Sequence, residues 1–148
     1  MRHIMNKVLT MLVGAILMVT VTGCSYIFYP RADEFAEKAK GATGVETLVN
    51  LTTMLAASAQ AARGGKGYDQ PLNDLHNQFH ALHDAMCGVT KEQAKTPAYA
   101  MAVTINKEMG TIFKRLWKYR NDQPQRDDHL DRFVMHVQAL RGTLQAIK

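Results

Sequence analysis

The sequence predicts an all-α protein, a small antiparallel four-helix bundle that follows an apolar N-terminal segment. In four separate segments, apolar residues recur at spacings of three and four, the period of one helix face. Residues that start or stop helices lie between these segments. No segment alternates apolar and polar residues as a half-buried strand does. The chain has 148 residues, enough for one domain.

The first two helices are expected within residues 31–62. Residues 31–40 predict a short helix in which Phe35 and Ala39 share one side. After a glycine-containing loop, Thr43 and Glu46 fit a capping box, so a long helix is expected to begin there. A cluster of glycines at 64–67 is expected to end this helix. Its apolar stripe consists of Leu48, Leu51, Leu55, Ala59 and Ala62.

The second long helix is expected to start at Asp69, which can act as its N-cap, with Pro71 in its first turn. Gly88 is expected to end it. Thr90 and Gln93 then offer another capping box, for a helix of about one turn. The apolar stripe of the second long helix consists of Leu72, Leu75, Phe79, Leu82 and Met86.

Two further long helices complete the predicted bundle. Thr96 as N-cap and Pro97 at the first helical position start the third, and Asn-Asp-Gln-Pro at 121–124 is expected to close it. The fourth is expected from about Asp127, because Asp127 and Asp128 suit the positive end of the helix dipole. The third stripe is Ile105, Met109, Ile112, Leu116 and Tyr119. The fourth is Leu130, Phe133, Val137, Leu140, Leu144 and Ile147.

The N-terminus has the order of a secretory signal: a basic start, an uncharged stretch of 14 residues at 8–21, then small residues. The stretch ends in Val-Thr-Gly-Cys at 21–24, which resembles the lipobox of bacterial lipoprotein precursors. The resemblance implies cleavage after Gly23, an S-diacylglyceryl group on Cys24 and acylation of its new amino group. Residues 1–23 would then be a signal peptide, 24–44 a lipidated tether with the short helix, and 45–148 the bundle domain.

The resemblance also implies a location. An aspartate directly after the lipidated cysteine would resemble an inner-membrane retention signal, but this position is Ser25. We therefore expect a bacterial outer-membrane protein that faces the periplasm. The aromatic residues at 26–29 would rest among the lipid headgroups, where tyrosine is favoured. An alternative is a single-span signal-anchored protein, because residues 8–29 form 22 largely apolar residues flanked by Lys7 and Arg31.

The second long helix carries a group of three histidines and a cysteine, at 76–87, with the composition of a metal site. Imidazole and thiolate are good ligands for zinc or copper, but one helix can give an ion only two adjacent ligands. His129 and His136 are the only other histidines after Cys24. The structural alternative is that the three histidines of the group pack against neighbours on the shoulder of the helix, with Cys87 buried as a small apolar residue. The group occupies positions i, i+4, i+7 and i+11: His76, His80, His83 and Cys87.

The charge is too small to imply nucleic acid, because residues 24–148 carry 16 bases and 13 acids, a net charge of +3. Residues 113–120, Phe-Lys-Arg-Leu-Trp-Lys-Tyr-Arg, interleave cations with aromatic residues. Cations suit a helix C-terminus. The alternative for this stretch is a binding face for anionic lipid or an acidic partner.

The expected function is non-catalytic binding or assembly in the cell envelope, for instance as an accessory of a secretion or conjugation apparatus. An enzyme is not expected, because the sequence shows no nucleophile–base pair and no cofactor motif. The expected partners are the bilayer, through Cys24, and an envelope protein. No cofactor is expected, and the one expected modification is the covalent lipid on Cys24. The alternative is a periplasmic protein that binds zinc or copper through the histidine stripe.

Overall fold

The computed structural model describes residues 31–67 and 69–147. Cys24 and the predicted signal peptide, tether and aromatic segment lie outside the described residues. The chain divides into a unit of residues 1–30 and a unit of residues 31–148. The short helix expected at 31–40 therefore belongs to the same compact unit as the bundle.

The all-α prediction is confirmed, since the described residues form helices and no strand. Four of the helices are long and correspond to the four predicted stripes. Two short helices and a 3₁₀ turn lie before and between them. In chain order the elements are α3 (Ala32–Lys38), α4 (Gly44–Ala62), α5 (Gln70–Ala85), η1 (Met86–Gly88), α6 (Lys91–Ala94), α7 (Pro97–Lys118) and α8 (Gln123–Gln145).

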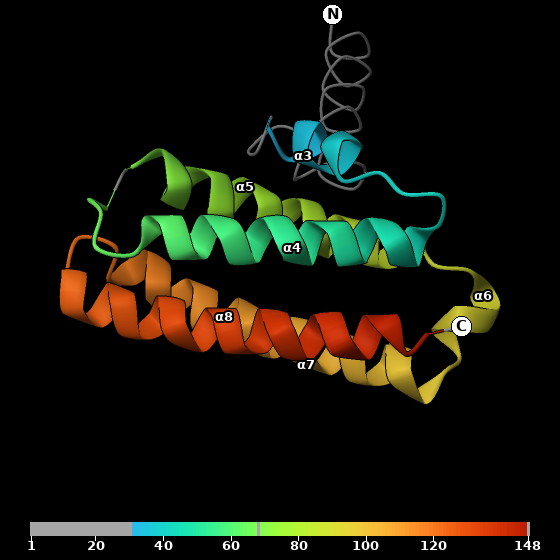
Figure 1. Cartoon of the computed structure of the whole chain (residues 1–148). Helices are drawn as coiled ribbons and strands as arrows, with labels where there is room; N and C mark the ends of the chain where they lie inside the picture. Colours follow the sequence, from blue (N-terminus) through green and yellow to red (C-terminus); the bar gives the residue numbers. More distant parts are fainter. Residues whose placement is uncertain (1–30, 68, 148) are drawn as a thin grey trace, which may run out of the picture. The chain divides into compact units, whose positions relative to one another are not determined.

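The long helices of the unit 31–148 lie side by side in two layers (Figure 1). One layer holds α4 and α5 and the other holds α7 and α8, and α4 also packs against α8. Figure 1 shows the chain turning back at each connection between the long helices. The short helix α3 packs on α5 and α4, on the side of that layer away from α7 and α8.

The predicted stripes of α4, α5 and α8 form the core, and every residue named in them is buried. On α7 the prediction is partly wrong, because Ile112 and Tyr119 are only half-buried while Phe113 is buried. The reason is the position of α5, since the ring of Phe113 stacks on Phe79 at a centroid distance of 4.8 Å. The inward face of α7 is therefore rotated toward α5.

The predicted N-caps of α4 and α7 are confirmed. Thr43 accepts a hydrogen bond from the backbone N–H of Glu46 at 3.1 Å, and Thr96 accepts one from Tyr99 at 3.1 Å. The Glu46 carboxylate accepts the N–H of Ala42, one residue before the expected partner, at 2.8 Å. These bonds satisfy backbone donors that a helix start leaves without a partner.

The predicted start of α8 is wrong by about one turn. The helix begins at Gln123, and Asp122 is its N-cap, accepting the backbone N–H of Gln125 at 3.3 Å. Pro124 does not end the preceding segment but sits in the first turn of α8, where its missing N–H has no helical partner to lose. Asp127 consequently lies inside the helix.

Candidate functional site

Cys24, the residue that the lipobox resemblance selects, lies outside the described residues. The described part of the chain places the other candidate residues in three regions. These are the interface between α5 and α7, the surface between α4 and α8, and the outer face of α7.

Aromatic rings and histidines fill the interface between α5 and α7. The His76 ring lies 4.2 Å from the Trp117 ring and 5.3 Å from the Phe113 ring, centroid to centroid. The His80 ring follows at 5.0 Å from His76. Two members of the predicted stripe therefore pack in a helix interface, as the structural alternative expected.

The last two members of the stripe are at the surface. His83 is exposed, and its Nδ1 accepts a hydrogen bond from the buried amide of Asn106 at 3.3 Å. Cys87 is exposed as well, so the expectation of a buried thiol is wrong. The reason is its position, because Cys87 follows the exposed His83 by four residues and so lies on the same face, at the 3₁₀ turn that ends α5. Met86 is the last buried residue of the stripe.

Burial changes the acid–base properties of the packed histidines. The pKa of His76 is lowered from 6.5 to about 4, chiefly by desolvation and in addition by the nearby His80. The pKa of His80 is also lowered, chiefly by desolvation and also by His83, while Asp84 acts in the opposite direction. At neutral pH His76 is therefore a neutral ring, which suits its contact with Trp117.

The two histidines of α8 face α7 and not α5. His136 Nε2 lies 3.5 Å from the Glu108 carboxylate, and its Nδ1 donates to the Arg132 carbonyl at 2.9 Å. The His129 ring stacks on Tyr119 at 5.7 Å. Within residues 31–67 and 69–147, no three His, Cys, Asp or Glu side chains converge as a metal site would require.

A buried arginine at one end of the bundle was missed by the sequence analysis. Arg126 is 1% exposed and donates to Asp127 Oδ1 at 3.3 Å and to the Arg120 carbonyl at 3.2 Å. Asp127 in turn accepts the backbone N–H of Gly64, from the loop after α4, at 3.3 Å. The signal was present, because Arg126 precedes Leu130 by four residues and so continues the α8 stripe.

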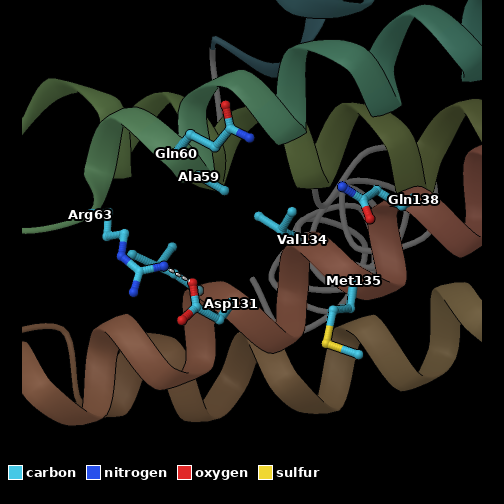
Figure 2. A pocket seen from close by; sticks show the side chains of 8 residues that line it. Ala59, Gln60, Arg63, Asp131, Val134, Met135 and Gln138 are labelled. Atoms are coloured by element: carbon cyan, nitrogen blue, oxygen red, sulfur yellow. Dashed lines mark hydrogen bonds and ion pairs between the residues drawn. The ribbon is translucent and has the colours of Figure 1, made fainter.

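A groove of about 300 Å³ lies between α4 and α8 (Figure 2). The two charged side chains in it, Arg63 and Asp131, form an ion pair with each other. The side of the groove includes Met135, which is 67% exposed. The groove offers apolar contact and amide hydrogen bonds to a ligand. It is lined by Ala59, Gln60, Arg63, Leu130, Asp131, Val134, Met135 and Gln138.

Comparison with known proteins gives no match. This holds for protein-family models, for curated proteins and for solved structures. Among the described helices, none combines the length and the apolar composition needed to cross a membrane.

Proposed function

We propose that the protein is a lipid-anchored lipoprotein of the bacterial outer membrane that faces the periplasm. Its role is non-catalytic: it acts as a binding or assembly accessory of the cell envelope, such as a secretion or conjugation apparatus. The bilayer holds it through Cys24, and an envelope protein is its partner.

The observation that carries the proposal is the Val-Thr-Gly-Cys sequence at 21–24, directly after an uncharged stretch of 14 residues. The compact helical unit begins at Arg31, seven residues after Cys24. A link of this length spans at most about 25 Å when fully extended. Lipid on Cys24 would therefore hold the bundle close to the membrane surface.

The strength of the anchor follows from the number of acyl chains. Each buried methylene contributes about 0.8 kcal/mol, and a single chain binds only reversibly. Cleavage after Gly23 and acylation of the new amino group would give Cys24 two or three chains, enough for stable anchoring.

The described candidate residues support binding more than catalysis. The packed histidines contact aromatic rings, with His76 between Phe113 and Trp117. In the groove, Arg63 and Asp131 form an ion pair with each other. Both are contacts between neighbouring helices, and neither brings a nucleophile next to a general base.

Metabolic labelling with palmitate tests the anchor. We expect the label on the parent protein and on a Cys87→Ala variant, but not on Cys24→Ala. Cys87→Ala is a matched control, because Cys87 is an exposed thiol and the only other cysteine. Label that persists on Cys24→Ala, or a purified protein that begins at Met1, would contradict the proposal.

A further inference from the structure

The net charge of the chain after the predicted cleavage site is confined to one helix. Residues 24–148 carry 16 bases and 13 acids, a net charge of +3. α7 (Pro97–Lys118) contains four of these bases and one of the acids, also a net charge of +3. The rest of residues 24–148 holds twelve of each and is neutral.

These four bases are exposed, and three of them form a line along α7. Lys107, Lys114 and Lys118 are separated by seven and four residues, which places them on one helix face, and Arg115 lies beside them. Val103, 44% exposed, extends the line by one turn toward the N-terminus. We call Val103, Lys107, Lys114, Arg115 and Lys118 the basic face.

The basic face is not neutralised by the protein itself. Some bases elsewhere pair with acids, as Arg132 does with Asp128 at 3.0 Å. In the ranges 31–67 and 69–147, no carboxylate forms an ion pair with a cation of the basic face. The acid of α7, Glu108, lies instead against His136 of α8.

The described residues show where the tether joins the helical unit, and this point is on another side of the unit than the basic face. Arg31, the first residue of the helical unit, contacts Asp74 of α5 at 3.4 Å, and α3 covers the layer of α4 and α5. On the proposed function, the lipid lies within about 25 Å of Arg31. α7, which carries the basic face, lies in the other layer of the helical unit (Figure 1).

The thickness of the bundle separates the basic face from the side on which the tether is attached. Each layer of helices is about 10 Å thick, so two layers separate the basic face from the α3 side by about 20 Å. The Debye length at physiological ionic strength is about 8 Å. Lipid that stays on the α3 side would therefore be largely screened from the basic face, whereas a protein in the periplasm could reach it.

We propose that the basic face of α7 is the docking surface for a negatively charged protein surface of the envelope partner. The cations supply the charge complementarity and Val103 an apolar contact. Opposite charge on the partner would speed association and orient it, which is the main effect of electrostatic complementarity. The bundle would thus bridge the membrane, on its α3 side, and the partner, on its α7 side.

The test uses the full-length acylated protein in nanodiscs of neutral phosphatidylcholine. The probe is a fluorescent acidic helical peptide of about 20 residues, with glutamate every three or four positions, and a glutamine version controls for charge. Binding is measured by fluorescence anisotropy. Lysine acetylation read by mass spectrometry reports which amines the peptide covers.

Two triple variants with the same change in net charge locate the site. The basic-face variant is Lys107→Glu, Lys114→Glu, Lys118→Glu, and the control is Lys66→Glu, Lys91→Glu, Lys95→Glu, all at exposed lysines. We expect the basic-face variant to weaken binding at least about tenfold and the control at most about threefold. The peptide should protect Lys114 and Lys118 from acetylation.

Three outcomes would overturn the docking proposal. One is no binding of the acidic peptide, and another is equal weakening by the two variants. The third is protection of Lys114 and Lys118 by about 30% phosphatidylglycerol in the nanodisc without peptide, which would assign the face to anionic lipid. Failure of the anchor itself is read separately, as loss of palmitate label on the parent protein.

Discussion

Arg126 is a buried cation that pairs with Asp127 of its own helix and donates to one of the connections between the helices. Its guanidinium bonds Asp127, and Asp127 also accepts the backbone N–H of Gly64, so one carboxylate joins the loop after α4 to the start of α8. The Arg120 carbonyl, in the connection between α7 and α8, accepts a further bond. Such a pair stabilises only while both partners are present.

We therefore expect Arg126→Ala to lower the free energy of unfolding by about 2–4 kcal/mol, because it leaves the largely buried Asp127 without its cation. The control is Arg132→Ala, which breaks the exposed pair with Asp128 and should cost at most about 0.5 kcal/mol. Urea denaturation of the unit 31–148 measures both. Equal losses in the two variants would contradict the role given to burial.

His76 should make stability depend on pH. Its pKa is lowered from 6.5 to about 4 in the folded protein, so between these values the unfolded chain binds the proton more readily. Stability is then complete above about pH 6.5 and falls as the pH decreases toward about 4. We expect His76→Gln to lose less stability than the parent between about pH 7.5 and about pH 5 in urea denaturation. A parental pH dependence in the variant would disprove this assignment.

Among the helices, two glycines should respond in opposite ways to the same substitution. A Cβ on Gly44, the first residue of α4, would collide with the Gly88 carbonyl group, whereas a Cβ on Gly142 of α8 meets open space. Gly142→Ala should raise the free energy of unfolding by about 0.5–1 kcal/mol through helix propensity. Gly44→Ala should lower it by about 1–3 kcal/mol, as overpacking does. Thermal denaturation tests the pair, and a stabilising Gly44→Ala would show that the contact yields easily.

Most of the helical architecture could be predicted from the sequence, because it follows from local signals. The stripes of α4, α5 and α8 are set by helical periodicity, and the caps at Thr43 and Thr96 by side chains three residues from their targets. The start of α8 was misplaced because Asp122 and Pro124 suit the end of one helix and the beginning of the next equally well.

The sites could be predicted less well, since they depend on which helices become neighbours. The spacing of His76 and His80 does not reveal that α7 places Trp117 and Phe113 against their side of α5. Whether Cys87 is buried depends on whether a neighbouring helix covers the end of α5 on the side of His83, and the sequence does not reveal that. Arg126 remained unnoticed because a charged residue in a stripe reads as an interruption until its partners are known.

Within the helical unit, the helix contacts and the charged surface lie in different places. α3 covers the layer of α4 and α5, and the interface between α5 and α7 is filled by rings. The net positive charge lies on the exposed face of α7, in the other layer. On the proposed function, the tethered side and the charged side of the protein are therefore different sides, which suits a component that connects a membrane to a partner.

The exposed thiol of Cys87 gives this arrangement a practical use. With Cys24 consumed by lipid, as proposed, a maleimide dye would attach at one position only, in the turn after α5. Energy transfer from that dye to a labelled lipid would then report the height of the turn above the bilayer, and a change on adding a partner would show the molecule tilting on its anchor.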